Sequence, residues 1–248
     1  MDMPPREPDF IEPPLPPLAW DALPGLFPGF ADPGRWLPLL RRHLELVEAA
    51  AGRVRVTAVA PPDAIRRQYA ESLELLRMAG PFEGSICDVG SGGGYPGIIV
   101  AAVLPEVPVH LVEPLRKRAG LLEEMATALG LANVTVHALR AEEAGRGPLR
   151  EQHGLVLARA VAEVRELLEY TAPLACPGGV IALPKGSRVH DELASAATAM
   201  RELGCVLAGC ELMRAEVNAA VTVVRFTRDG AMPAKYPRRP GIPGKRPL

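Results

Sequence analysis

A glycine-rich segment, residues 90–97, constrains the fold of this chain more than any other feature. The apolar run 86–89 precedes it and contains one acid, Asp88, while the apolar run 98–104 follows it. A strand, a tight turn and the N-terminus of a helix account for this order, and such a unit opens nucleotide-binding α/β folds. Because glycines let the backbone adopt positive φ angles and pass close to a ligand, we expect a binding site at this turn.

A second acid follows the next predicted strand. Residues 109–112 form that strand, and Glu113 ends it about 20 residues beyond the glycine turn. An acid in this place accepts hydrogen bonds from the hydroxyls of a ribose. The turn and Glu113 together therefore indicate a ligand that contains adenosine.

The glycine spacing leaves more than one adenosine ligand open. Gly92, Gly94 and Gly97 fit the pattern G-x-G-x-x-G, so an NAD(P)-dependent oxidoreductase is one interpretation. In the dinucleotide fingerprint, however, the first glycine directly follows the strand. Gly90 has that place here, and the third glycine would then fall on Tyr95. A turn that serves only the packing of strand against helix is a further interpretation.

Asp88 favours a cationic ligand over a pyrophosphate. A carboxylate at the end of the strand repels phosphate, whereas it attracts an ammonium or a sulfonium group. S-adenosylmethionine (AdoMet) has no phosphate and carries two positive groups. The residues of the turn therefore favour AdoMet as the cofactor.

Composition limits the class of protein. The chain has 248 residues, of which 48% are hydrophobic, and its net charge is −1. This content supports a sizeable core, and any contact with nucleic acid must come from a local basic patch. The four cysteines form no C-x-x-C pair and no metal-binding pattern with histidine, which indicates reduced thiols in a cytoplasmic protein. Proline and charges interrupt the apolar runs, so neither a signal peptide nor a membrane span is expected.

The sequence changes character along its length. The predicted parts are a proline-rich arm at 1–34, a helical cap at 35–84, a nucleotide-binding domain at 85–228 and a basic tail at 229–248. We expect the arm to be extended or disordered, with Trp20, Phe27 and Phe30 as residues that could attach it to a surface. Helical spacing of the apolar residues predicts two cap helices, at 36–51 and 62–78.

Strand and helix alternate through the third part. Strands are predicted at 86–89, 109–112, 134–138, 155–158 and 180–183, and a β-rich end at 205–228. Helices are predicted at 96–104, 115–129, 141–144, 164–174 and 191–203. A turn at 176–179 introduces the fifth strand. Such alternation predicts an α/β fold in which helices cover both faces of a mostly parallel sheet.

The tail after Asp229 contains basic residues and no acid. Its cations are Lys235, Arg238, Arg239, Lys245 and Arg246. Proline and glycine should keep it from forming a helix, and Tyr236 could stack on a base. We therefore expect the tail to contact RNA phosphates, with a solvated terminus as the alternative.

Five motifs occur in one order along the chain. They are residues 88–97, 111–118, Arg140-Ala141-Glu142, Ala158-Arg159-Ala160 and Leu183-Pro184-Lys185-Gly186. The ordered set, over about residues 36–228, resembles the bacterial small-subunit ribosomal RNA methyltransferase G family, also called glucose-inhibited division protein B. The resemblance implies a Rossmann-like class I methyltransferase with a mostly parallel seven-stranded sheet, which uses AdoMet to methylate N7 of one guanine in 16S ribosomal RNA.

The resemblance also implies roles for individual residues. The residues expected to bind AdoMet are Asp88, Gly90, Gly92, Tyr95, Glu113, Pro114, Leu115, Ala141, Glu142 and Arg159. Those expected at the methyl-transfer site are Arg159, Arg140 and Lys185. No metal is expected, and the expected partner of this monomeric enzyme is 16S ribosomal RNA in the small subunit or its precursor.

Four positions depart from the family pattern, and they concern the cap and the last strand. Arg55 stands where the family commonly has Asn, and Gln68 and Glu71 stand where His and Asp are usual. Ala219 lies where an arginine is expected. These departures leave the contacts of the cap open, whereas the cofactor motifs are intact.

The residues agree with attack by a ring nitrogen. Guanine N7 has a free lone pair, so it needs no general base, and none is evident. A cytosine C5 enzyme would need a thiolate nucleophile, for which Cys176, before Pro177, is the only candidate, with a residue of a plain turn as the alternative interpretation. Arg159 and Arg140 are expected to hold phosphate or guanine O6, with surface ion pairs as the alternative. A non-catalytic RNA-binding protein of the same fold is the remaining interpretation.

Overall fold

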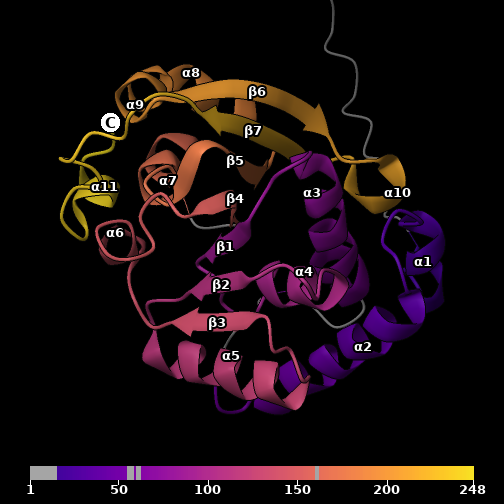
Figure 1. Ribbon diagram of the computed structural model, residues 1–248. Helices are drawn as coiled ribbons and strands as arrows, with labels where there is room; N and C mark the ends of the chain where they lie inside the picture. Colours follow the sequence, from indigo (N-terminus) through magenta and orange to yellow (C-terminus); the bar gives the residue numbers. More distant parts are fainter. Residues whose placement is uncertain (1–15, 55–58, 60–62, 160–161) are drawn as a thin grey trace, which may run out of the picture.

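A seven-stranded sheet forms the centre of the protein, with strand order β3-β2-β1-β4-β5-β7-β6 (Figure 1). The computed structural model describes residues 16–54, 59, 63–159 and 162–248. The strands are β1 (Ser85–Val89), β2 (Val109–Val112), β3 (Val134–His137), β4 (His153–Ala158), β5 (Ala175–Lys185), β6 (Cys205–Leu212) and β7 (Thr222–Arg228). The pairs among β1 to β5 are parallel, and β7 is antiparallel to β5 and β6, which confirms a mostly parallel sheet.

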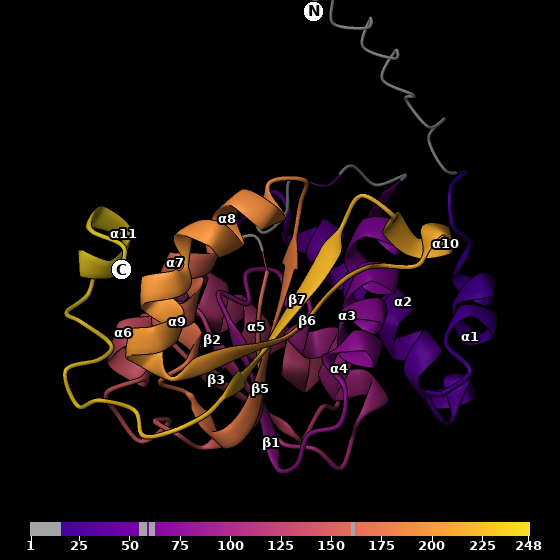
Figure 2. The ribbon, with the colours of Figure 1, turned by 90° about the horizontal axis from the view of Figure 1, so that it is seen from above.

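Two groups of helices cover the two faces of the sheet (Figure 2). The first group is η1 (Trp20–Ala22), α1 (Leu23–Leu26), α2 (Pro33–Ala50), η3 (Ile65–Ala70), α3 (Glu71–Ala79), α4 (Gly97–Val103), α5 (Arg116–Ala128) and α10 (Ala215–Asn218). The second is α6 (Ala141–Ala144), α7 (Val164–Thr171), α8 (Val189–Ser195), α9 (Ala197–Leu203) and α11 (Ile242–Lys245). Within the described ranges, none of these helices has the length and apolarity needed to cross a membrane.

Each face of the sheet has its own hydrophobic core. Ile86 and Ile98 belong to the core under α2 to α5, while Cys87 and Val89 belong to the core under α7 to α9. Successive side chains of a strand point to opposite faces, so β1 supplies both cores. Every residue of α4 is buried, which explains why its sequence is continuously apolar rather than amphipathic.

Residues 20–26, near the start of the described part of the protein, are helical and do not form an extended arm. Leu23 and Phe27 are buried, and the Trp20 ring lies edge-on to Tyr69, with their centroids 4.7 Å apart. The expectation of an extended or disordered arm is therefore wrong for residues 20–26, whereas the expected attachment through Trp20 and Phe27 is confirmed. Residues 1–15 lie outside the described part of the chain.

Several predicted elements have different limits in the structure. The expected turn at 176–179 is a bulge within β5, because Ala175 pairs with His153 and Val180 pairs with Leu155. The helix expected at 191–203 is divided at Ala196 into α8 and α9. The second cap helix begins with a π-helical stretch, η3, and its predicted start at residue 62 lies outside the described ranges.

Residues 235–238 of the basic tail pack on α7 and α9, so this part of the tail is not the solvated terminus that was the alternative interpretation. The Arg238 guanidinium lies 2.5 Å from the buried carboxylate of Glu169, and Tyr236 is only 4% exposed. Lys235 pairs with Glu202 at 2.8 Å. Four residues after Arg238, α11 forms a short helix, so the expectation that proline and glycine prevent a helix in the tail is wrong; Pro243 lies in the first helical turn, where proline is tolerated. Tyr236 is thus a packing residue and not an exposed ring for a base, whereas Arg239, Lys245 and Arg246 remain exposed.

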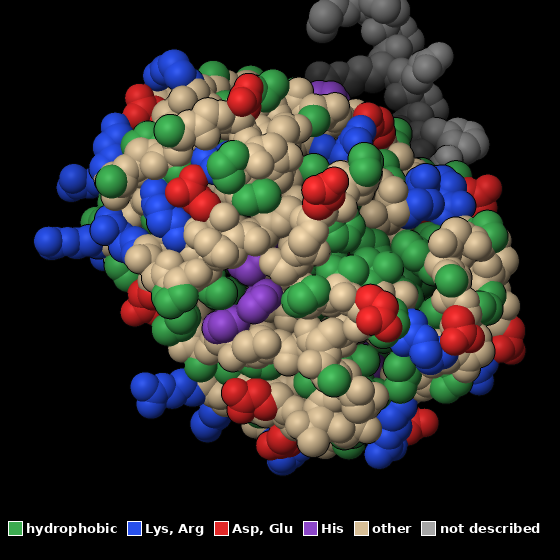
Figure 3. All heavy atoms as spheres, in the orientation of Figure 1, with side chains coloured by type: hydrophobic (Ala, Val, Ile, Leu, Met, Phe, Trp, Pro, Cys, Tyr) green, Lys and Arg blue, Asp and Glu red, His purple; other side chains and the backbone are tan. Residues whose placement is uncertain are grey.

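Three histidines, on β2, β3 and β4, lie close together, and histidine side chains are visible near the middle of the molecule in Figure 3. His110 Nδ1 lies 3.0 Å from His137 Nε2, and the ring centroids of His110 and His153 are 4.9 Å apart. One nitrogen of the close pair must donate and the other accept, so the pair is not doubly protonated. Burial, and then the two neighbouring imidazoles, lower the pKa of His153 to about 4.

We expect His153 to reduce stability in acid. The unfolded chain, with a histidine pKa near 6.5, binds more protons than the folded chain at any pH between about 4 and 6.5. The free energy of unfolding therefore falls by roughly 2–3 kcal/mol from pH 7 to pH 4.5 through this one group. His153→Asn keeps a polar atom beside Ser85 but does not titrate, so urea unfolding should show a smaller loss in this variant. Equal losses would contradict the assignment.

Candidate functional site

The glycine turn between β1 and α4 has the backbone that the sequence predicts. Gly90, Gly92 and Gly94 have φ angles of 77°, 54° and 90°, a region that side chains disfavour. Gly97 is needed for a different reason, since a Cβ there would lie 2.2 Å from the Leu111 side chain. The turn therefore depends on glycine for its conformation and for the close approach of α4 to the sheet.

Two buried acids hold this turn from the side of the sheet. Asp88 Oδ2 accepts a hydrogen bond from the Gly97 amide at 3.0 Å. Its Oδ1 is buried and has no partner among the described residues, and burial raises the pKa of Asp88 to about 6. Glu113 accepts from the amides of Gly92 and Leu115, each at 2.9 Å. Both carboxylates lie where parallel strands end, at the edge where α/β folds bind their ligands.

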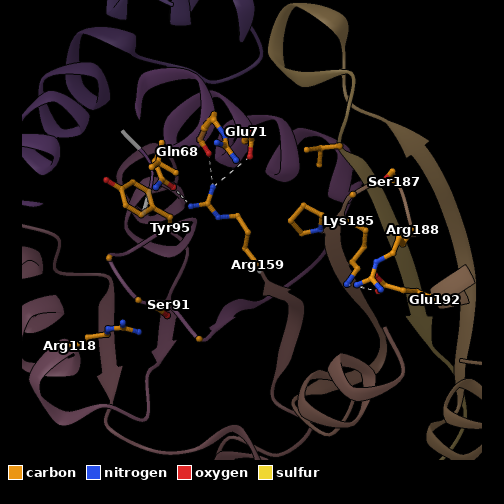
Figure 4. A pocket seen from close by; sticks show the side chains of 18 residues that line it. Gln68, Glu71, Ser91, Tyr95, Arg118, Arg159, Lys185, Ser187, Arg188 and Glu192 are labelled. Carbon is orange, nitrogen blue, oxygen red and sulfur yellow. Dashed lines mark hydrogen bonds and ion pairs between the residues drawn. The ribbon is translucent and has the colours of Figure 1, made fainter. Parts of the chain in front are cut away.

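A cavity of about 620 Å³ opens beside the turn, at the carboxyl ends of β1, β4 and β5 (Figure 4). The predicted residues that line it are Gly90, Gly92, Tyr95, Arg159 and Lys185. Further lining residues that sequence reasoning did not assign include Arg67, Gln68, Glu71, Arg188 and Glu192. The cavity thus combines the cofactor turn with groups from the cap and from the segment that follows β5.

Arg159 extends from the end of β4 to the cap. Its guanidinium donates to the Arg67 carbonyl at 2.8 Å and to the Gln68 side-chain oxygen, and it lies 3.8 Å from Glu71 Oε2. The guanidinium carbon is 5.4 Å from the centre of the Tyr95 ring. Burial lowers the pKa of Arg159, while the nearby carboxylates of Glu71 and Asp88 oppose this shift. The arginine is therefore fixed on several sides within the cavity.

Gln68 and Glu71 contact Arg159 in the cavity, which sequence reasoning did not predict. They depart from the family pattern, yet both converge on Arg159 (Figure 4). Asn218 Nδ2 donates to Glu71 Oε1 at 2.7 Å, so α10 joins the same network. Their spacing of three places both side chains on one face of a helix, which was the available sequence signal.

The structure does not bring every predicted residue to the cavity. Lys185 lines it, but its Nζ lies 2.6 Å from Glu192 and donates to the Ala162 carbonyl at 2.8 Å. Arg140 is exposed at the start of α6 and does not line the cavity. Of the three cations expected at the methyl-transfer site, Arg159 and the paired Lys185 therefore line the cavity, and Arg140 does not.

The remaining cofactor candidates lie beyond the cavity, near Glu113. Pro114 and Leu115 follow β2, and Leu115 is 53% exposed. Ala141 and Glu142 begin α6, and Glu142 Oε1 accepts from the Gly241 amide of the tail at 2.8 Å. These residues border the ends of β2 and β3, so their proposed contact with adenine lies on the far side of Glu113 from Arg159.

The donor set fits AdoMet. The unpartnered Asp88 Oδ1 suits a ligand with positive charge, Glu113 offers acceptors for a ribose, and the turn 90–97 has no basic residue for a pyrophosphate. The fold has known counterparts. A crystal structure of a SAM-dependent methyltransferase from Aquifex aeolicus superposes with a TM-score of 0.52 at 17% identity, over 67% of this chain and 93% of that one. The fold is therefore that of class I AdoMet-dependent methyltransferases, and the donor set of the site is compatible with this cofactor.

Sequence comparison identifies the family. Residues 37–216 match the GidB family model, described as rRNA small subunit methyltransferase G. The Ribosomal RNA small subunit methyltransferase G of Roseiflexus sp. (strain RS-1) is 39% identical over 86% of this chain and 92% of that protein. That of Carboxydothermus hydrogenoformans is 37% identical over 86% and 92%. The chain belongs to the rRNA small subunit methyltransferase G family, which excludes the NAD(P)-dependent oxidoreductase and the non-catalytic interpretation.

We expect Gly97→Ala to destabilise the protein by about 1–3 kcal/mol, because the new methyl group overpacks against Leu111 and Asp88. Gly120→Ala is the matched control. Gly120 lies inside α5 with open space around its Cα, so alanine there should add roughly 0.5–1 kcal/mol of helix stability. Urea unfolding measures both changes. Similar changes in the two variants would contradict the close packing at Gly97.

Proposed function

We propose that this enzyme methylates N7 of one guanine in 16S ribosomal RNA by direct in-line transfer, without a general base. N7 carries a lone pair in the plane of the ring and no proton. The observation that carries the proposal is the state of the two acids lining the cavity. Glu71 bonds to Asn218 and lies beside Arg159, and Glu192 pairs with Lys185, so each is engaged.

The position of Cys176 supports attack without a covalent enzyme–base adduct. The thiol belongs to the first residues of β5, while Lys185 at the other end of that strand lines the cavity. A cytosine C5 mechanism requires a thiolate at the reacting base. Cys87 and Cys205 are buried, and burial raises the pKa of both thiols.

Arg159 is the residue proposed to orient the guanine. The guanidinium of an arginine donates well to guanine O6. Because its charge would oppose the positive charge that develops at N7, the guanidinium must not face N7 directly. The contacts with Gln68, Arg67 and Glu71 fix its orientation toward the cap. Placement of N7 relative to the methyl group would then supply most of the rate enhancement.

Phosphate binding is proposed for exposed cations at the mouth of the cavity. Arg67 and Arg188 line the cavity and are exposed. Lys185 suits this role less well, because Glu192 already neutralises it. Arg140 and the exposed tail residues Arg239 and Lys245 would extend the basic surface outward. This distribution reconciles RNA binding with a net charge of −1.

Asp88 and Glu113 are proposed to hold AdoMet. When bound, AdoMet supplies a methyl group on a positively charged sulfur, which a neutral lone pair attacks. Asp88 would balance the cofactor's positive charge, and Glu113 would accept from its ribose. Gly90, Gly92 and Tyr95 would line the binding site of AdoMet. The residues proposed to border its adenine are Pro114, Leu115, Ala141 and Glu142.

We propose a monomer that acts in the cytoplasm. The substrate, ribosomal RNA, is made and assembled in the cytoplasm of bacteria. Light scattering of the purified protein, alone and with AdoMet, gives its molar mass and so tests whether it is a monomer.

We expect Glu113→Ala to lower AdoMet affinity by about 10- to 100-fold, because a charged acceptor worth about 1.5–3 kcal/mol is removed. Glu123→Ala, an exposed acid in α5, is the control and should bind as the wild type does. Calorimetric titration gives both affinities. An unchanged affinity in a folded Glu113→Ala protein would refute the ribose assignment.

Direct attack by N7 predicts a methyl-transfer rate that changes less than about twofold between pH 7 and pH 9, because no proton leaves the base before transfer. Single-turnover transfer of labelled methyl to ribosomal RNA from unmodified cells measures the rate, and mapping of the product identifies the base. Cys176→Ser should keep this rate. A tenfold rise per pH unit, a methyl group on an exocyclic nitrogen or a trapped covalent adduct would contradict the mechanism.

A further inference from the structure

Three buried aromatic side chains form a hydrogen-bonded chain beneath the glycine turn. His43 of α2 and Tyr69 of η3 come from the cap, and Tyr95 belongs to the turn. His43 Nε2 lies 2.9 Å from the Gly93 carbonyl, and His43 Nδ1 lies 3.0 Å from the Tyr69 hydroxyl. The Tyr69 and Tyr95 hydroxyls are 3.3 Å apart. His43 and Tyr69 are fully buried, and Tyr95 is 5% exposed.

The direction of this chain follows from its end at a carbonyl. The Gly93 oxygen only accepts, so His43 Nε2 must carry a hydrogen and donate it. Burial lowers the pKa of His43 to about 4, so the ring is neutral and Nδ1 accepts from the Tyr69 hydroxyl. Tyr69 in turn accepts from Tyr95. The series of hydrogen bonds therefore starts at Tyr95 and ends at the carbonyl of Gly93, and both residues belong to the glycine turn.

Close packing leaves little freedom for another arrangement. A Cβ at Gly94 would lie 3.1 Å from His43 Nε2, so the imidazole lies directly against the backbone of the turn. The Tyr95 ring lies at right angles to Tyr69, with centroids 5.5 Å apart, and close to the Arg159 guanidinium. One network thus contacts both the turn that is proposed to hold AdoMet and the arginine that is proposed to orient the guanine.

We propose that His43 and Tyr69 are positioning residues, through which the cap fixes the AdoMet turn and sets Tyr95 against Arg159. This inference rests on the proposed cofactor site at the turn. His43 restrains the Gly93 carbonyl, and Tyr69 restrains the ring that faces Arg159. The cap thereby does more than cover the core, because it determines the relative position of the cofactor and the substrate base.

The two nitrogens of His43 can be tested separately. In His43→Gln the amide nitrogen reaches the place of Nε2 and can still donate to Gly93. In His43→Asn the shorter amide reaches only the place of Nδ1, so it retains a partner for Tyr69 and leaves the Gly93 carbonyl without a donor. We expect His43→Asn to weaken AdoMet binding about tenfold or more, and His43→Gln to stay within about threefold of the wild type.

Hydrogen exchange provides a readout apart from activity and AdoMet binding. The amides of Gly94 and Tyr95 bond to the Ser91 carbonyl within the turn, at 2.7 and 3.2 Å. We expect both to exchange faster in His43→Asn than in His43→Gln without any ligand. Tyr69→Phe leaves His43 on Gly93 but releases Tyr95. It should therefore lower kcat about threefold to tenfold with little change in AdoMet affinity.

The outcomes distinguish the hydrogen-bonded series of Tyr95, Tyr69 and His43, here called the relay, from the cofactor site itself. If AdoMet affinity falls in His43→Asn but not in His43→Gln, the result supports the relay. Equal losses in the two His43 variants, each folded by thermal unfolding, would show that His43 only fills space and would overturn the proposal. Wild-type protein that fails to bind AdoMet would overturn the cofactor site and the relay with it. Should His43→Asn not fold, unchanged exchange and unchanged kcat in Tyr69→Phe would overturn the relay.

Discussion

The close approach of α4 to β1 at Gly97 is the contact on which the site depends. A side chain at this position would collide with Leu111 and with the carboxylate of Asp88. Because the helix begins so close to the strand, Asp88 can accept the Gly97 amide within a buried environment. The intervening backbone must then turn sharply, which it does through glycines at positive φ. Glu113 completes the arrangement by accepting the Gly92 amide.

The cap and the nucleotide-binding part are one structural unit. Residues of α2, α3, α4 and the sheet share a single hydrophobic core, so the boundary predicted at residue 84 is a change of sequence pattern and not a gap in packing. Polar contacts also join the two parts, because Arg159 at the end of β4 contacts Gln68 and Glu71 of the cap. A displacement of the cap would therefore alter the site directly.

Local patterns predicted the part of the site that local chemistry determines. The strand, the glycine turn and the acid Glu113 are each visible in short windows of sequence, and the structure has them where they were expected. The partners of Arg159 could not be predicted in this way, because Gln68 is 91 positions away and a pairing of that range depends on the tertiary fold. The prediction of an exposed Tyr236 was wrong for the same reason. Composition does not reveal that Arg238, two residues later, pairs with the buried Glu169 and so holds this part of the tail against the protein.

The sheet order also explains how one cavity could serve a cationic cofactor and a polyanionic RNA. Asp88 and Glu113 lie at the carboxyl ends of β1 and β2, whereas Arg159 and Lys185 lie at the carboxyl ends of β4 and β5, on the other side of the glycine turn. The two carboxylates are buried and accept hydrogen bonds from backbone amides of the turn and of Leu115, so they lie on the side of the proposed cofactor and not on the side of the RNA. The cations face the cavity from the opposite half of the sheet. Because opposite charges occupy different strand ends, both ligands would meet at the glycine turn without each repelling the site of the other.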